Sequence, residues 1–143
     1  MSDRKCRMAL KVSHPAVQRK FAPGEEQAFK REMIRVKQML HPERTYFEVE
    51  NEEKEPGFPD TIEVFENNRA RFVEYKVSDE KGIIEFQRGQ PLWYRRNRKL
   101  DIRIIAWCVP DNEYWVFTAD DALEIIKGHE KDRKVSIKGG MMV

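Results

Sequence analysis

The sequence predicts an α/β protein of the α+β type, in which helices flank a mixed sheet. Helical and strand-like segments follow one another in the order helix, three strands, helix, two strands, helix. The 143 residues, 40% of them hydrophobic, are enough to form one core without disulfide or metal staples. We therefore expect one domain over residues 23–128, preceded by a basic arm at 1–22 and followed by a polar, basic tail at 129–143.

The first helix is predicted over residues 23–40. Its first turn carries Glu25 and Glu26 and Lys37 lies near its end, which is the distribution that the helix dipole favours. His41-Pro42 then ends the helix, because the residue before a proline disfavours the helical conformation. Apolar residues recur on one stripe of this helix, at Phe29, Met33, Val36 and Leu40.

Three strands follow at residues 45–49, 61–65 and 71–77, and each is rich in β-branched or aromatic side chains. Residues 66–69, between the second and third strands, form an Asn-rich turn that tolerates positive φ. We therefore expect the last two of these strands to pair as a hairpin.

The second half of the chain is predicted to contain two helices and two strands. Pro91 fits the first turn of a helix, where no backbone donor is needed, and Thr118 fits the N-cap of another. Apart from Asp101 and Arg103, the first strand of this half is apolar, as in a strand covered on both faces. Residues 83–88 fit either a strand or a loop. The four elements are predicted at residues 91–99, 101–109, 114–118 and 119–127.

The composition argues against several classes of protein. The two cysteines, Cys6 and Cys108, are far apart and lack metal-ligand neighbours, which favours a reducing compartment. No apolar run approaches the roughly 20 residues of a membrane span, and the N-terminus has no signal-peptide core. We therefore expect a cytoplasmic protein without a membrane partner, in the host cytoplasm if the source is viral.

The net charge of +2 conceals an uneven distribution. Residues 1–38 and 95–103 are strongly basic, whereas residues 43–66 are strongly acidic. Basic ends around an acidic centre suit a protein that binds a polyanion and presents carboxylates to a metal ion. Ordinary solvated faces are the alternative explanation.

The hairpin carries charged residues where a strand would be apolar. Side chains alternate across a strand, so Glu74 and Lys76 share one face. If the hairpin pairs about its turn, Asp60 and Glu74 converge at one end beside the Lys76 ammonium. Two carboxylates and a lysine can hold a hard divalent cation together with a water molecule. A hairpin whose charges simply face solvent is the alternative.

Two motifs carry a family resemblance. Pro59-Asp60 followed by Glu74-Tyr75-Lys76 resembles the PD-(D/E)xK nuclease signature. The pattern Gln90-x-x-Trp93 resembles the VRR-NUC branch and related phage and archaeal nucleases that resolve Holliday junctions. The resemblance covers about residues 24–109 and implies a restriction-endonuclease-like fold with an α-β-β-β-α-β core and flanking helices.

The resemblance also implies a Mg²⁺ site in which Mn²⁺ can substitute. The implied metal ligands are Asp60, Glu74 and the backbone carbonyl of Tyr75. Lys76 would position the attacking water, and Gln90 would contact the water shell of the ion or a phosphate.

Further site residues are expected on the two helices. The family often takes an acid from its first helix as a metal ligand, here Glu26 or the neighbouring Glu25, and a surface acid that compensates the helix dipole is the alternative. We expect Trp93 in the core. A basic group after it is expected to take DNA phosphates, three of its members lying on one helix face. This group is Arg95, Arg96, Arg98 and Lys99.

The predicted function is that of a Mg²⁺-dependent phosphodiesterase that cleaves DNA, an endonuclease rather than an exonuclease. Residues 23–128 would then be a single nuclease domain. A junction or flap is the expected substrate, and a phage or viral source and a homodimer would fit the junction-cutting relatives. The alternatives are a catalytically inactive nucleic-acid-binding or protein-interaction module of the same fold, and an interaction protein with structural carboxylates.

Overall fold

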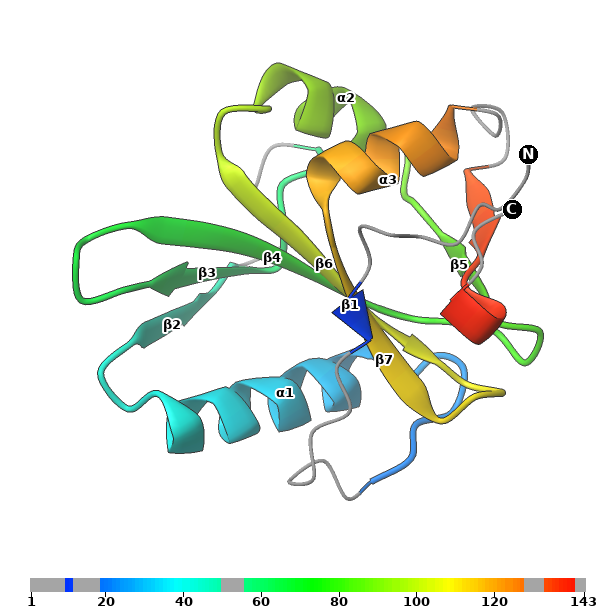
Figure 1. Ribbon diagram of the computed structural model, residues 1–143, viewed down its shortest axis with the longest axis horizontal. Coiled ribbons are helices and arrows are strands. Elements are labelled where there is room, and N and C mark those ends of the chain that lie inside the picture. The colour runs from blue at the N-terminus through cyan, green and yellow to red at the C-terminus, as the bar shows by residue number, and fades with distance from the viewer. Residues whose placement is uncertain (1–9, 12–18, 50–55, 128–132, 141–143) are drawn as a thin grey trace.

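The computed structural model describes residues 10–11, 19–49, 56–127 and 133–140. Within these ranges six strands form one sheet in the order β1-β7-β6-β4-β3-β2, and two short strands, β5 and β8, pair separately (Figure 1). The main-sheet strands are β1 (Leu10–Lys11), β2 (Thr45–Glu48), β3 (Thr61–Val64), β4 (Ala70–Val77), β6 (Asp101–Cys108) and β7 (Glu113–Thr118). The remaining elements are β5 (Ile83–Glu85), β8 (Lys134–Ser136), the helices α1 (Glu26–Leu40), α2 (Gln90–Arg96) and α3 (Ala119–Ile126), and a short 3₁₀ helix at Lys138–Gly140.

Strand β4 lies at the centre of the main sheet. It pairs antiparallel with β3, which in turn pairs antiparallel with β2. On its other side β4 is parallel to β6, and β7 returns antiparallel to β6. The connection from β4 to β6 contains β5 and α2. The predicted mixed sheet with flanking helices is therefore confirmed.

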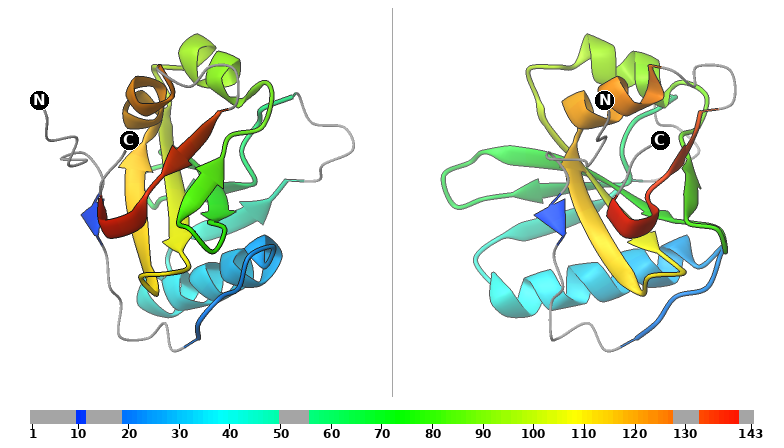
Figure 2. Two further views of the ribbon diagram at one scale, coloured as in Figure 1. Left: turned by 90° about the vertical axis from the view of Figure 1, so that its right-hand side faces the viewer. Right: turned by 45° about the vertical axis from the view of Figure 1, so that its right-hand side comes forward.

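Helices cover both faces of the main sheet. Figure 2 shows α1 on one side and α2 with α3 on the other. Phe29 of α1 packs in one core with Tyr75 of β4, whereas Trp93 of α2 and Ile104 of β6 belong to the opposite core. Trp93 is 4% exposed, as expected of a core residue. None of the helices in the described ranges combines the length and the apolar character needed to cross a membrane.

Helix α2 is shorter than predicted. It begins at Gln90, with Pro91 in its first turn as expected, but it ends at Arg96. The Asn97 N–H bonds to carbonyls of the last turn, and the Asn97 side-chain amide donates to the Trp93 carbonyl at 2.9 Å. These bonds satisfy acceptors that a longer helix would have satisfied, so the chain turns toward β6 earlier than its composition suggests.

Parts of the predicted arm and tail belong to the folded domain. Strand β1 pairs with β7, and Phe21 is 3% exposed in the core beneath α1. Strand β8 pairs with β5, and Val135 and Ile137 are each 1% exposed. The predicted boundaries differ here because a few apolar side chains in polar stretches complete the core. The remaining parts of the arm and tail lie outside the described residues, as does the acidic loop. These ranges are 1–9, which includes Cys6, 12–18, 50–55, 128–132 and 141–143.

An ion pair between half-buried Lys37 and buried Glu63 joins α1 to the sheet. Lys37 Nζ donates to Glu63 Oε1 of β3 and, at 3.0 Å, to the Tyr75 hydroxyl of β4. The Glu63 side chain is 1% exposed. Burial lowers the pKa of Lys37, whereas burial and then the Glu63 carboxylate raise the pKa of Tyr75 well above its usual value. This network fixes the end of α1 over the strands that carry the candidate site.

We predict that Lys37→Met destabilises the protein by about 3 kcal/mol, because it leaves the Glu63 carboxylate buried without its counter-ion. The double variant Lys37→Met/Glu63→Gln should recover part of that loss. Lys30→Met is the matched control on the same helix: Lys30 is also buried, but its partner Glu48, 3.6 Å from Lys30 Nζ, has a side chain that is 58% exposed and stays solvated when the lysine is removed. Urea unfolding should show a loss below about 1 kcal/mol for this control. Equal losses for Lys37→Met and Lys30→Met would contradict the proposed role of the buried pair.

Candidate active site at the start of β3

The register between β3 and β4 places Asp60 beside Glu74. Thr61 lies opposite Val73 in this register, so the preceding residue, Asp60, meets Glu74 where β3 begins. Asp60 Oδ2 accepts a hydrogen bond from the Tyr75 N–H at 3.1 Å, which holds the carboxylate at the peptide between Glu74 and Tyr75. The structure therefore brings these two carboxylate residues together at one end of the hairpin.

Lys76 lies two residues further along β4, on the same face as Glu74. Its Nζ is 3.9 Å from Glu74 Oε2, and it donates to the Glu85 carbonyl of β5 at 2.8 Å. The same atom lies 5.1 Å from the centre of the Phe86 ring. Glu74 and Lys76 are each 4% exposed, so their charges interact in surroundings where electrostatic effects are stronger than in water.

The start of α2 packs against the loop that leads to Asp60. A side-chain carbon at Gly57 would come within 2.4 Å of the Gly89 carbonyl oxygen, so the close approach requires glycine. This contact places Gln90, the first residue of α2, next to that loop. Gln90 is 2% exposed, and its side-chain oxygen accepts a hydrogen bond from the Gln87 N–H at 2.8 Å. The predicted supporting role would therefore fall to the Gln90 amide NH₂ group.

Of the two candidate acids on the first helix, Glu26 is the one near the site. The pKa of Glu26 is raised, mainly because the side chain is partly desolvated. The Lys76 ammonium acts to lower this pKa, and the Asp60 carboxylate acts to raise it. Its carboxyl group is therefore within electrostatic range of both. Glu25 instead accepts hydrogen bonds from Arg19 and from the Ala22 N–H, at 2.5 Å and 2.8 Å, and serves the turn before α1.

Tyr94 of α2 is a site residue that the sequence motifs do not identify. Its hydroxyl is buried and finds no hydrogen-bond partner among the residues that the structure describes. Burial, and after it the carboxylates of Glu74 and Asp60, raise the pKa of Tyr94 well above its usual value. The phenol is therefore a neutral donor near both carboxylates. Its position four residues after Gln90, on the same helix face, is the signal that points to it.

The arrangement suits a hard divalent cation that keeps most of its water. Mg²⁺ takes few protein oxygens, usually one or two carboxylates, and retains several water molecules. Asp60 and Glu74 can supply those carboxylates, and the partly exposed Asp60 and the exposed Glu26 lie toward solvent. In the described ranges no three His, Cys, Asp or Glu side chains are gathered closely enough to hold an ion. A water-rich site therefore fits better than a closed metal cage, and the Tyr75 carbonyl stays a predicted ligand.

The predicted DNA-binding residues do not share one helix face. Arg95 and Arg96 end α2, whereas Arg98 and Lys99 follow the helix, and all four are exposed. Arg98 Nε lies 3.1 Å from Asp120 Oδ1 in the first turn of α3, while Lys99 lines a cavity beside the β3–β4 turn. The prediction of a single basic helix face is therefore wrong, because the helix ends before two of its members.

Comparison with protein-family models, with curated proteins and with solved structures found no match. The functional proposal below therefore rests on the geometry of Asp60, Glu74 and Lys76 and on the motifs that contain them.

The site geometry predicts opposite shifts of the Glu26 pKa in two variants. Lys76→Met should raise it further, because the ammonium that lowers it is removed. Asp60→Asn should lower it, because the carboxylate that raises it is removed. Side-chain ¹³C NMR titration of Glu26 in metal-free buffer measures both shifts. Lys81→Met, at an exposed lysine between β4 and β5, is the control and should leave this pKa unchanged. Identical Glu26 titrations in all variants would show that α1 does not begin beside Lys76 and Asp60.

Proposed function

We propose that this protein is a Mg²⁺-dependent nuclease that hydrolyses phosphodiester bonds in DNA. The observation that carries the proposal is the convergence of Asp60 with Glu74, with the Lys76 amino group 3.9 Å from the Glu74 carboxylate. The resemblance of these residues to the PD-(D/E)xK signature supports the same chemistry. Endonuclease action on branched DNA, such as junctions or flaps, is the substrate class that the resemblance favours.

Each site residue has a role in such a reaction. A bound Mg²⁺ would polarise the phosphodiester and make hydroxide available near neutral pH. Asp60 and Glu74 would hold the ion from two paired strands. The Lys76 ammonium is held by the Glu85 carbonyl and by Glu74, so it can orient the attacking water and stabilise developing negative charge.

Burial would increase the catalytic effect of Glu74 and Lys76. The nearly complete burial of Glu74 and Lys76 strengthens their effect on a developing charge, because little water screens them. A binding module of the same fold that does not cut DNA would have no chemical need for Asp60, Glu74 and Lys76 together. It is therefore the less well-supported candidate.

Cleavage is predicted to require Mg²⁺ or Mn²⁺ and to stop in EDTA. Asp60→Asn and Glu74→Gln should each lower the rate by orders of magnitude, because either change removes a carboxylate that holds the ion. The assay incubates the protein and each metal with labelled linear, flapped or four-way DNA. It measures the cleavage rate and the substrate preference together. Glu80→Gln, an exposed acid between β4 and β5, is the control and should cut at the normal rate. Undiminished cleavage in EDTA would rule out this mechanism.

Lys76→Met is predicted to lower the cleavage rate by about 100-fold or more while DNA binding in the presence of Mg²⁺ is retained. Methionine keeps most of the side-chain volume between β4 and Phe86, so circular dichroism should confirm that the variant folds. Single-turnover cleavage and fluorescence anisotropy separate the two effects. A Lys76→Met protein that cuts at nearly the normal rate would mean that the lysine is structural.

A further inference from the structure

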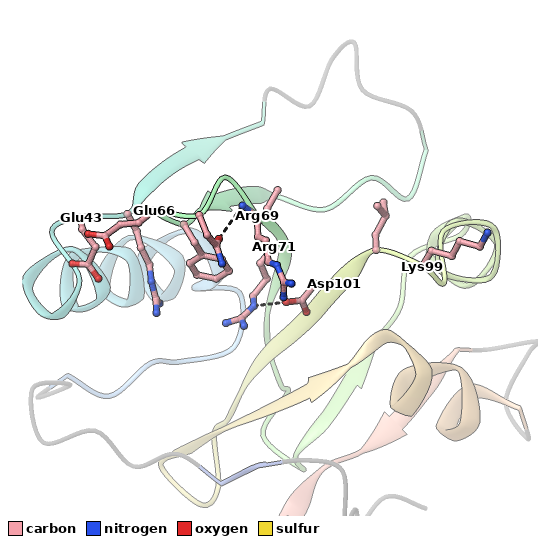
Figure 3. A pocket seen from close by; sticks show the side chains of 11 residues that line it. Glu43, Glu66, Arg69, Arg71, Lys99 and Asp101 are labelled. Atoms are coloured by element: carbon pink, nitrogen blue, oxygen red, sulfur yellow. Dashed lines mark hydrogen bonds and ion pairs between the residues drawn. The ribbon is translucent and has the colours of Figure 1, made fainter.

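A cavity of about 700 Å³ lies away from the carboxylate site, at the tip of the β3–β4 hairpin (Figure 3). Its lining comes from three places that are distant in the sequence: the turn before β2, the turn between β3 and β4, and the turn from α2 into β6. Arg44, Phe65, Arg69, Arg71 and Lys99 supply its cationic and aromatic groups.

Two guanidinium groups in this cavity lie over one aromatic ring. The Arg44 guanidinium carbon is 4.5 Å from the centre of the Phe65 ring, and that of Arg71 is 4.9 Å from it. A guanidinium over a ring is fixed in orientation, and its N–H donors, which lie in its own plane, stay available to an anion. Arg71 uses Nε on Asp101, at 3.0 Å, and a guanidinium carries further donors beyond that one.

The charge in the cavity is only partly compensated by the chain itself. Asp101 is shared between Arg71 and Arg103, at 3.0 Å and 2.8 Å. Arg69 and Lys99 are exposed and form no ion pair with any residue in the described ranges. Figure 3 shows Glu43 and Glu66 together at one end, with Arg71 and Lys99 away from them. The end near Lys99 is therefore the part that can accept an anion.

We propose that this cavity binds the phosphate groups of a single nucleic-acid strand. Planar guanidiniums suit phosphate oxygens because they donate two parallel hydrogen bonds, and two exposed cations on separate turns suit a ligand that carries more than one phosphate. A positively charged groove that follows the backbone is also part of the usual surface for single strands, and here the Phe65 ring serves to hold the two guanidiniums. Figure 3 shows Arg69 and Lys99 apart along the cavity, which is why we expect a ligand with more than one phosphate.

The position of the cavity assigns it a part in substrate binding, and in this respect the inference rests on the proposed nuclease function. Arg71 precedes Glu74 by three residues on β4, which corresponds to about 10 Å along the strand. An odd separation puts the two side chains on opposite faces of the sheet. The cavity would therefore hold a strand that has passed the hairpin tip, and not the phosphate that is cut.

The test is a salt titration of DNA binding in EDTA, where no cleavage is expected. A fluorescent oligothymidylate is bound to the full chain and to Arg69→Gln/Lys99→Gln, with fluorescence anisotropy as the readout. Loss of two phosphate contacts should weaken binding and flatten the plot of log affinity against log salt by about 1.4 units. The control Lys81→Gln/Lys127→Gln removes the same charge from exposed positions outside the cavity and should keep the normal slope. Thermal unfolding checks that both variants fold.

A second variant tests the cavity without removing a cation. Ala70 lines the cavity and is exposed, so Ala70→Glu brings a carboxylate there and should weaken binding more than Ala70→Gln does. Three outcomes would overturn the proposal. They are normal binding by both cavity variants, equal slope changes in the cavity and control double variants, and no binding by the unaltered protein. Thymidine monophosphate that competes as well as the oligonucleotide would overturn it in favour of a small phosphate ligand.

These outcomes are separable from those of the nuclease proposal. Binding that depends on the cavity, in a protein that never cuts DNA, would contradict the nuclease and support the strand site. Metal-dependent cleavage with a salt slope that the cavity variants do not change would support the nuclease and contradict the strand site.

Discussion

The pairing of β3 with β4 is the constraint on which the candidate site depends. Because side chains alternate with a period of two, a slip of one residue would send one strand's side chains to the wrong face and separate Asp60 from Glu74. Two features oppose such a slip. The tight turn holds Asn68 at a φ of 65°, which this residue type tolerates better than most. Glu63 is tied to Lys37 on the α1 face, so a shifted β3 would also bury an uncompensated charge.

Each face of the sheet carries a pair of opposite charges that is largely buried. The groups that surround each pair give the two pairs different roles. Lys37 Nζ donates to both the Glu63 carboxylate and the Tyr75 hydroxyl, which makes that cluster a link between α1 and the sheet. Glu74 and Lys76 are 3.9 Å apart and have Asp60, Glu26 and the Tyr94 hydroxyl around them. The second cluster therefore has acceptors and donors to offer an incoming ion and phosphate, whereas the first is committed to the fold.

Local patterns in the sequence predict much of this structure, and contacts between distant segments account for the rest. Alternation and turn chemistry predict the hairpin, and with it the meeting of Asp60 and Glu74 beside Lys76. The apolar stripe of α1 predicts its buried face, although Leu40 at its end is 49% exposed. Tyr94 shares a helix face with Gln90, but the carboxylates of Glu74 and Asp60 near it come from other elements, so the sequence alone does not place it beside them. The pairing of β5 with β8 and the cavity at the hairpin tip likewise arise from segments far apart in the chain.

Locating a bound metal ion would test the central claim most directly. A crystal soaked in Mn²⁺, with anomalous scattering recorded at the manganese edge, would place the ion without assuming any activity. The account predicts a peak coordinated by carboxylate oxygens of both Asp60 and Glu74, at roughly 2 Å, with water in most other positions. A protein that cuts DNA in Mn²⁺ while its crystals hold the ion elsewhere, away from both carboxylates, would contradict the account.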